Sequence, residues 1–409
     1  MSDRGKTENR DLPRSSDLQP LAVGLLSAVI GFAAAVAVVL QGYAAAGAST
    51  AAAASALLAL CVVKGMLGVW LSVRTRMPIT IAWSTPSAAL LVAVGAPAQG
   101  WPETVGAFLI AAALIVFAGL FKPFAQLIAR IPTSLAAAML AGVLFELCLA
   151  PVRAVEADPM LAAPVVIVWA LALRFARLYA VPLAALAATV IIAGSVDLPA
   201  GAFADLSPQA AFVTPVFTMD AAIGLAAPLF IVTMASQNIP GLAVLNANGY
   251  RADPAPIFVS TGLASGVIGL FGGHQINLAA ITAALCAGPE AHPDPARRWL
   301  ASAAAGTGYL LFGLTATAVT AFVAAAPQLL IQAVAGLALL SSLAGALATS
   351  LRSEEQQAPA VLTFVIAASG VTFLGVGAAF WALVTGGALL IILSIGRKAS
   401  ARTDAGTAR

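Results

Sequence analysis

A histidine, a glutamine and an asparagine stand together in the apolar stretch FGGHQINLAAITAALCAGP, residues 271 to 289, in the order His274, Gln275, Ile276 and Asn277. Polar groups inside a membrane are costly unless they are used, and imidazole titrates nearest to physiological pH. We therefore expect His274 to carry a proton and to bind a ligand together with its neighbours. The alternative is a neutral histidine that is satisfied between helices.

A second polar cluster interrupts the apolar run TMASQNIPGLAVL, residues 233 to 245. Pro240 denies Ser236 its usual helical partner. Three consecutive polar residues point around most of a helix, so one neighbouring helix cannot cover all of them. We expect Gln237 and Asn238 to line the same site, with hydrogen bonding between helices as the alternative.

Two isolated charges also lie within apolar segments, Glu146 in LAGVLFELCLAP and Lys64 in LCVVKGML. A carboxylate at that depth is a candidate second proton carrier beside His274. A buried ion pair between Glu146 and Lys64, or snorkelling of either side chain toward an interface, is the alternative. A direct transport role for Lys64 also stays open.

The elements that must position these residues are membrane spans. Of 409 residues, 61% are hydrophobic and 9% are charged, whereas soluble domains have roughly a quarter charged. A span needs roughly 20 apolar residues, and the pattern predicts an all-α polytopic membrane protein with 14 spans. The predicted spans are 21–42, 51–72, 79–97, 104–121, 133–150, 159–173, 178–195, 220–242, 255–270, 274–288, 299–321, 328–349, 357–373 and 376–396.

The positions of the basic residues set the predicted orientation. With the N-terminus inside, 18 of the 20 Lys and Arg residues are cytoplasmic, and the exceptions are Arg153 and Lys64. The positive-inside rule therefore predicts that both termini are cytoplasmic. The polar start of the chain has no short apolar region with a cleavage site, so no cleaved signal peptide is expected.

Several functional classes are not favoured. The basic residues sit singly or in pairs at span ends, so nucleic acid is not an expected partner. Glu290, His292 and Asp294 gather in the loop 288–299, but no second histidine or cysteine completes a metal site. We expect no metal and no other cofactor. The polar residues within the spans form no nucleophile and base constellation, which argues against an enzyme.

Two short matches indicate an internal repeat. SAAL at 87–90 matches TAAL at 282–285, an offset of 195, and LAGVL at 140–144 matches VAGLA at 334–338, an offset of 194. Each match pairs spans that are seven apart, and an odd displacement inverts the second copy in the membrane. The predicted units are a tail (1–20), a first seven-span repeat (21–195), a linker (196–219), an inverted second repeat (220–396) and a tail (397–409).

The third and tenth spans are expected to be short extended strands followed by half helices. Ser84 and Pro86 predict the start of one half helix, and Asn277 is expected to be the N-cap of the other. Two helix N-termini meeting at mid-membrane would suit an anion. Trp83, just before the first break, is expected to stack on a flat ligand.

The runs NIPGLAVLNANGY (238–250) and GGHQINLAAITAALCAGPEAHPDPARRW (272–299) resemble the signature segments of the benzoate/proton symporter family. The resemblance extends over the whole chain in length and span count. It implies uptake of benzoate or a similar aromatic carboxylate with a proton across a bacterial inner membrane by alternating access. It also implies the seven-plus-seven inverted fold of nucleobase and sulfate transporters, with a core domain (spans 1–4 and 8–11) and a gate domain (spans 5–7 and 12–14).

The resemblance also implies a site and partners. Carried over by position, the substrate site falls on Trp83, Ser84, Gln237, Asn238, His274, Gln275, Ile276 and Asn277. Nucleobase relatives place acidic residues where this chain has Gln237, Asn238 and Gln275, which disfavours a nucleobase. A uniporter or exchanger of another small anion, a nucleobase-type symporter and a channel are the alternatives. The expected partners are the anion, protons and the lipid bilayer, and a homodimer stays open.

Overall fold

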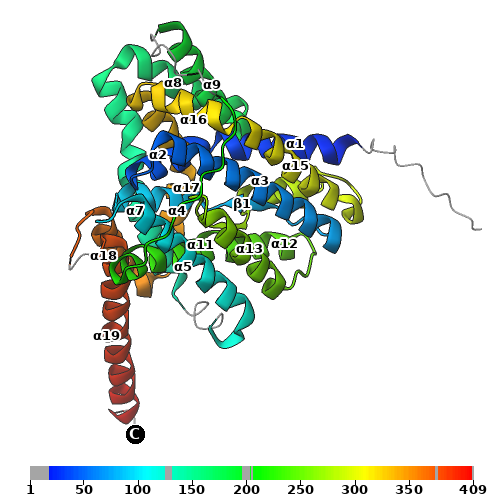
Figure 1. Cartoon of the computed structure of the whole chain (residues 1–409). Coiled ribbons are helices and arrows are strands. Elements are labelled where there is room, and N and C mark those ends of the chain that lie inside the picture. The colour runs from blue at the N-terminus through cyan, green and yellow to red at the C-terminus, as the bar shows by residue number, and fades with distance from the viewer. Residues whose placement is uncertain (1–17, 125–130, 196–202, 204–205, 374–375, 408–409) are drawn as a thin grey trace, which may run out of the picture.

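The computed structural model describes the chain except residues 1–17, 125–130, 196–202, 204–205, 374–375 and 408–409. Most of the expected N-terminal tail and part of the expected linker lie outside the described residues. The described chain is mainly helical, with two short strands (Figure 1). Its first half contains α1 (Leu18–Ala33), α2 (Val36–Ala45), α3 (Thr50–Thr75), β1 (Ile81–Trp83), α4 (Thr85–Val94), α5 (Trp101–Leu120), α7 (Thr133–Ala157), α8 (Pro159–Phe175), η1 (Arg177–Tyr179) and α9 (Ala180–Ser195).

The second half begins with a long helix that contains two π-helical segments. These segments are η2 and η3, and such bulges are frequent at functional sites. The elements are α10 (Met219–Ala221), η2 (Ala222–Ala226), α11 (Ala227–Thr233), η3 (Met234–Asn238), α12 (Ile239–Ala247), α13 (Pro254–Gly269), β2 (Ile276–Leu278), α14 (Ile281–Ala287), η4 (Pro295–Arg297), α15 (Trp299–Leu314), α16 (Ala316–Ala325), α17 (Gln328–Ser350), η5 (Glu354–Gln356), α18 (Gln357–Ala368) and α19 (Ala378–Thr407).

Eight helices of the described chain are long and apolar enough to cross a bilayer. The pair Pro295–Leu314 and Ala316–Ala325, which bends by 60°, would make a ninth. Each predicted span overlaps a helix, but several of these helices are short or broken. The protein is a mostly helical membrane protein, and the count of 14 spans stays a prediction.

Small residues let the helices pack closely. A Cβ atom added to Gly65 of α3 would lie 2.6 Å from the carbonyl oxygen of Gly306 in α15, and one added to Gly306 would lie 2.7 Å from the carbonyl oxygen of Gly65. Close backbone approach of this kind is how helices associate in membranes, where lipid is as apolar as a leucine side chain. The contact fixes α3 against α15 in the interior of the protein.

The helix contacts define two groups. In the first, α15 packs against α1, α3 and α14, and α5 packs against α13. In the second, α7 packs against α17 and α18, and α18 packs against α19. Figure 1 shows the second group around α7 and α18, with α19 extending away from the rest of the chain.

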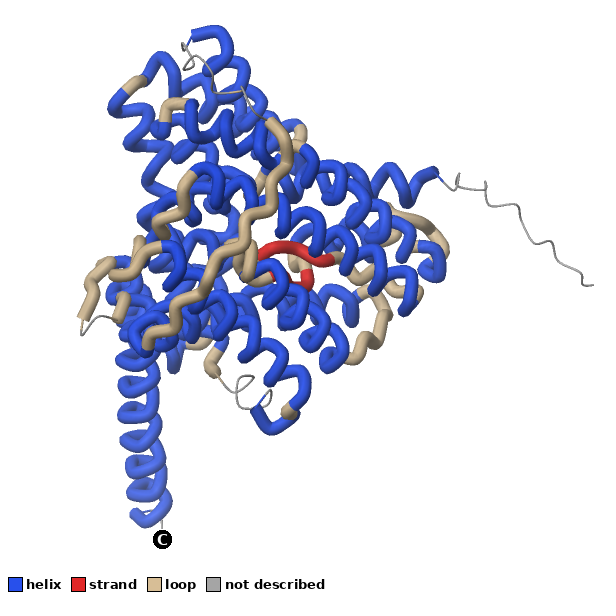
Figure 2. The backbone as a smooth tube through the Cα atoms, viewed as in Figure 1, coloured by secondary structure: helices blue, strands red, loops and turns tan. Residues whose placement is uncertain are grey.

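The two strands pair near the centre of the molecule (Figure 2). They are antiparallel, with Ala82 opposite Asn277, 195 positions further along the chain. The ladder continues on both sides, because Ser84 donates its backbone N–H to Gln275 O at 3.0 Å and Ala279 donates to Thr80 O at 2.9 Å. Backbone of this kind is tolerated at membrane depth only inside protein, where its polar groups are paired.

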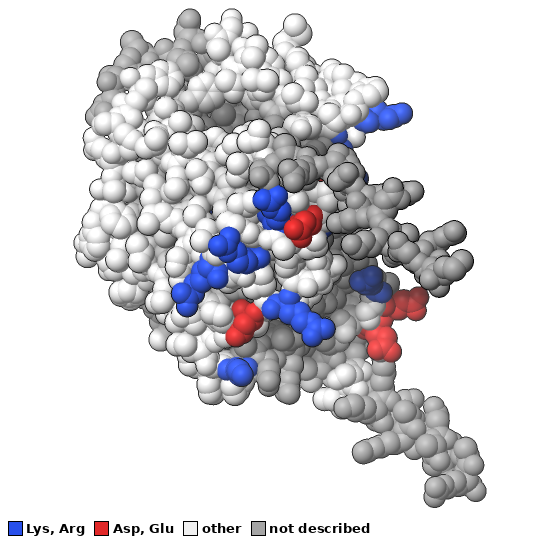
Figure 3. All heavy atoms as spheres, turned by 90° about the vertical axis from the view of Figure 1, so that its right-hand side faces the viewer, with Lys and Arg blue, Asp and Glu red and all other residues white. Residues whose placement is uncertain are grey.

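An extended segment, residues 206–218, crosses the surface near the strands and appears as a long tan tube in Figure 2. Val213 donates its N–H to Leu270 O and Val216 to Pro102 O, both at 2.9 Å. A different face, at the right of Figure 1, carries several Lys and Arg side chains amid a largely uncharged surface (Figure 3).

Candidate functional site

Ser84 closes the end of β1 and caps α4. Its Oγ accepts a hydrogen bond from the backbone N–H of Ser87, and Ser87 Oγ and Thr233 Oγ1 lie 2.6 Å and 3.1 Å from it. Pro86 lies in the first turn, where its missing N–H has no helical partner to lose. The hydroxyl of Ser84 therefore caps the N-terminus of α4, and it forms its hydrogen bonds with other residues of the protein.

His274 is completely buried and bonded through both ring nitrogens. Nδ1 lies 2.7 Å from the hydroxyl of Tyr43, and Nε2 lies 3.1 Å from the carbonyl oxygen of Ser84. Because a carbonyl only accepts, Nε2 carries the hydrogen and Nδ1 accepts from Tyr43. The neutral imidazole thus joins α2 to the turn between β1 and α4, and it does not line the cavities described below.

The amides beside His274 are also turned into the protein. Gln275 Nε2 donates to Phe108 O at 3.1 Å, and Asn277 Nδ2 donates to Leu278 O at 2.7 Å. The backbone N–H of Ile276 donates to Ser265 Oγ at 3.0 Å. These contacts hold β2 in place, and the four predicted residues from 274 to 277 lie together in the core of the first helix group.

The expectation that Asn277 caps the second half helix is wrong. Asn277 lies within β2, and α14 begins at Ile281 with Ala280 at its N-cap position. The strand continues because Asn238 Oδ1 accepts the N–H of Leu278 at 3.0 Å and the next residue pairs with Thr80. Asn238 is therefore a support for the strand, and it is fully buried.

A small cavity of ≈130 Å³ lies between the two helix groups, about ten times the space that holds one water. Of the predicted site residues, Trp83 and Gln237 line it. The helix break between α1 and α2 contributes Ala34 and Ala35. The other lining residues are Ile30, Gly31, Lys64, Ala82, Thr85, Pro86, Leu144, Ala279, Ala280, Thr282, Tyr309, Ala338, Leu339 and Ser342.

Two aromatic rings and the amino group of one lysine lie together at the wall of this cavity. The rings of Trp83 and Tyr309 meet edge to face with centroids 5.5 Å apart. Lys64 Nζ lies 4.0 Å from the Trp83 ring centroid and 3.0 Å from that of Tyr309. Aromatic faces attract cations and also pack against flat ligands. The sequence analysis does not select Tyr309, and it leaves the role of Lys64 open.

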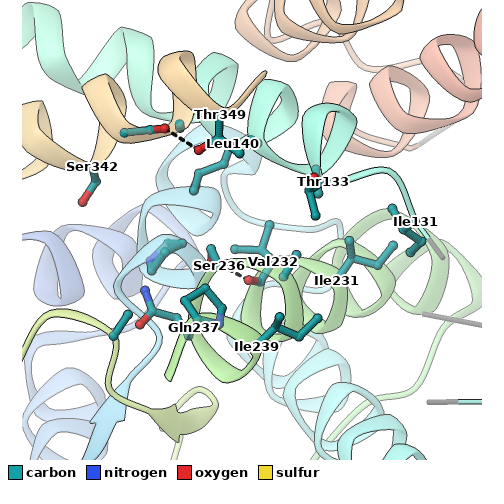
Figure 4. Close-up of a pocket in the computed structure, with 18 of the residues that line it drawn as sticks. Ile131, Thr133, Leu140, Ile231, Val232, Ser236, Gln237, Ile239, Ser342 and Thr349 are labelled. Atoms are coloured by element: carbon teal, nitrogen blue, oxygen red, sulfur yellow. Dashed lines mark hydrogen bonds between the residues drawn. The ribbon is translucent and has the colours of Figure 1, made fainter. Parts of the chain in front are cut away.

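A larger cavity of ≈680 Å³ adjoins the first, and the two share Pro86, Gln237, Ala280 and Ser342 in their walls. It runs between α4, η3 and α12 on one side and α7 and α17 on the other. Figure 4 shows Ser236 and Gln237 on one wall and Ser342 and Thr349 on the opposite wall. Arg352, near the predicted cytoplasmic end of α17, also lines it.

The described residues that line either cavity include two charged groups, Lys64 and Arg352, and both are basic. Glu146 lies elsewhere: it forms an ion pair with Arg153 on the same helix, and both side chains are more than half exposed. A buried pair between Glu146 and Lys64 is not formed. The arrangement is thus an aromatic-lined cavity with one basic side chain, and it adjoins a wider cavity.

The family model described as "Benzoate membrane transport protein" (BenE) matches residues 15–392. The chain belongs to the benzoate membrane transport family. The family resemblance noted from the two signature segments is thereby confirmed. As a member of this family, the chain is a multi-pass membrane transporter and not an enzyme.

Two curated relatives match nearly the whole chain. The inner membrane protein YdcO of Escherichia coli (strain K12) is 41% identical over 375 residues, 92% of this chain and 96% of that protein. The benzoate membrane transport protein of Acinetobacter baylyi (strain ATCC 33305 / BD413 / ADP1) is 31% identical over 380 residues, 92% of this chain and 95% of that protein.

Solved structures share the family's fold at low sequence identity. The transmembrane domain of a cyanobacterial bicarbonate transporter, BicA, has a TM-score of 0.55 at 15% identity, covering 87% of this chain and 98% of that one. SLC26A9 also has a TM-score of 0.55, at 14% identity, covering 97% of this chain and 73% of that one. These likenesses bear on the fold alone.

Proposed function

We propose that the protein takes up benzoate or a similar aromatic carboxylate together with a proton across a bacterial inner membrane. The observation that carries this proposal is the small cavity, in which Trp83 and Tyr309 offer flat apolar faces and Lys64 offers positive charge. An aromatic carboxylate has the complementary parts, a flat ring and an anionic group. The name of the Acinetobacter baylyi relative supports the same substrate class.

Alternating access is the proposed transport mechanism. The pairing of Ala82 with Asn277, 195 positions apart, supports an inverted repeat, because an antiparallel pair on a pseudo-twofold axis joins equivalent residues. We propose that spans 1–4 and 8–11 form a core that carries the substrate and that spans 5–7 and 12–14 form a gate. The cavities lie between α4, η3 and α15, which belong to the proposed core, and α7 and α17, which belong to the proposed gate.

The orientation follows from charge. The larger cavity includes Arg352, which the positive-inside rule assigns to the cytoplasm together with both termini. We propose that the described conformation is open toward the cytoplasm. The extended segment 206–218 would then cover the outer side, where substrate enters in the opposite conformation.

The proton carrier is proposed on chemical grounds. His274 bonds the carbonyl of Ser84, the residue after Trp83, so a second proton on Nδ1 would convert Tyr43 from donor to acceptor and alter the support of the small cavity. We propose that Gln237 contacts the ligand. The other predicted site residues would hold the walls of the small cavity in place, and these are Ser84, Asn238, Gln275, Ile276 and Asn277. A proton role for Glu146 stays a prediction.

Uptake of labelled benzoate into proteoliposomes tests the proposal. We expect a more acidic exterior to drive uptake, because each carboxylate would enter with a proton. Equal uptake with and without the pH gradient would exclude proton coupling, and the protein would then be a uniporter or an exchanger. Competition with nucleobases and inorganic anions tests the substrate class, and ionic currents far above transporter rates would indicate a channel.

A further inference from the structure

Lys64 has an unusual environment for a charged side chain. It is 1% exposed, and its Nζ has no hydrogen-bond acceptor within the described part of the chain. Lysine is almost never fully buried without a partner, because an unpaired ammonium loses its hydration. Two aromatic rings offset only part of that loss. An anion beside Nζ would supply the acceptor that the described residues do not.

The position of Lys64 is built into the helix packing. The close contact of Gly65 with Gly306 presses α3 against α15, and Tyr309 lies one helical turn beyond Gly306. This contact holds the ammonium between the rings of Tyr309 and Trp83 at the wall of the small cavity. A larger residue at either glycine would move Lys64 away from the rings.

We propose that Lys64 is the cationic residue that binds the carboxylate of the substrate. The proposal rests on the proposed function for the identity of the ligand and adds the group that selects an anion. The ammonium has three donors, and a carboxylate supplies the acceptors that the protein does not. The ring of the ligand then lies beside Trp83, with Ala338 and Leu339 of α17 on the other side of the cavity.

Arg352 does not replace Lys64 in this role. Its side chain is exposed and lines the larger cavity, whereas the smaller cavity has Lys64 as the charged residue among its described lining. Lys64 therefore selects anionic over uncharged ligands at the binding position itself. Benzoate should bind well, and benzamide, which has the same ring but no charge, should bind weakly.

Binding of labelled benzoate and benzamide to purified protein tests the assignment. Lys64→Met keeps an unbranched apolar chain and removes the charge, and Lys122→Met, at an exposed lysine just beyond α5, is the matched control. We expect Lys64→Met to weaken benzoate binding by at least about tenfold, the loss expected for a charged hydrogen-bonded partner. Benzamide binding should change by less than about twofold, Lys64→Arg should retain part of the benzoate preference, and Lys122→Met should match the wild type.

A purely structural role would lower the unfolding midpoint of Lys64→Met and weaken both ligands equally, which would overturn the assignment. So would unchanged benzoate binding. If the wild type binds no aromatic carboxylate, the proposed function fails and the assignment with it. If the wild type binds benzoate and only the variant result disagrees, the role of Lys64 alone fails.

A measurement on the wild type decides the matter if the variants do not fold. Reductive methylation with formaldehyde and cyanoborohydride as the hydride donor labels accessible amines, and mass spectrometry reads each lysine separately. We expect benzoate to protect Lys64 at least about threefold, because the amine is then occupied and the cavity filled. Lys122 should be labelled equally with and without benzoate, and equal labelling of Lys64 would overturn the proposal.

Discussion

The hydroxyl oxygen of Tyr43 lies 2.7 Å from Nδ1 of His274 and 3.3 Å from the backbone nitrogen of the same residue. One hydroxyl in α2 therefore holds both the ring and the main chain of the segment before β2. Through Nε2 and the carbonyl of Ser84, the same imidazole reaches the start of α4. The two strand-containing segments are thus joined by side chains as well as by the strand ladder.

Replacement of Tyr43 by phenylalanine should destabilise the protein by about 1–3 kcal/mol, because it leaves a buried ring nitrogen and a buried N–H without a partner. The unfolding midpoint in detergent measures the effect. Tyr179→Phe, at a partly exposed tyrosine in η1, is the control and should leave the midpoint nearly unchanged. An unchanged midpoint for Tyr43→Phe would mean that the hydrogen bonds do not hold this segment.

The close approach of α3 and α15 predicts a second effect. Gly306→Ala puts a methyl group 2.7 Å from the carbonyl oxygen of Gly65, so the helices must separate, at a cost of about 1–3 kcal/mol. Gly266→Ala in α13 is the matched control, because a Cβ there meets nothing within 4 Å. The control should be neutral or stabilising by up to about 1 kcal/mol.

Uptake should fall with Gly306→Ala beyond the loss of folded protein, since Lys64 and Tyr309 would no longer face each other at 3.0 Å. Rates are therefore compared per folded transporter at a temperature below both midpoints. Normal uptake and a normal midpoint would contradict the close contact between these helices.

Sequence reasoning located the segments of the site better than the directions of its side chains. Gln237 and Trp83 do line the small cavity, and both were selected because polar or aromatic residues lay at helix breaks. His274 and Asn277 were selected by the same rule, but they point into the core. Residues 274 to 277 are all fully buried, and side chains and backbone of α2 and α5 bond His274 and Gln275, so the packing of neighbouring helices decides which residues face the cavity.

The contact of Lys64 with Tyr309 could not be predicted from the sequence, for a different reason. The residues lie on helices that are far apart in sequence, and their proximity depends on the glycines at 65 and 306. Glycine is common in membrane helices, so neither residue stands out in one sequence. The boundary of α14 was misjudged because Asn238 and Thr80, also distant in sequence, extend β2 beyond the residue that resembled a cap.

Neighbouring amides in η3 should have separable roles. Gln237 lines both cavities, so Gln237→Leu should impair benzoate uptake at least about fivefold, mainly through KM, with a small change in stability. Asn238 is fully buried and bonds the backbone of Leu278, so Asn238→Leu should lower stability by about 1–3 kcal/mol. Parallel uptake and unfolding measurements compare the two variants, and equal effects of both on stability would contradict this division.

The direction in which the cavities open predicts the side from which Ser342 is reached. Ser342 of α17 lines both cavities, and the larger cavity includes Arg352 near the predicted cytoplasmic end. A cysteine at position 342 should react with a charged thiol reagent several-fold faster in inside-out than in right-side-out vesicles, because water reaches it from the cytoplasmic side and the thiolate is the reactive form. Benzoate should slow the reaction by filling the smaller cavity. The parent protein supplies the background, since its Cys61, Cys148 and Cys286 are all buried. Faster labelling in right-side-out vesicles would reverse the proposed orientation of the open cavity.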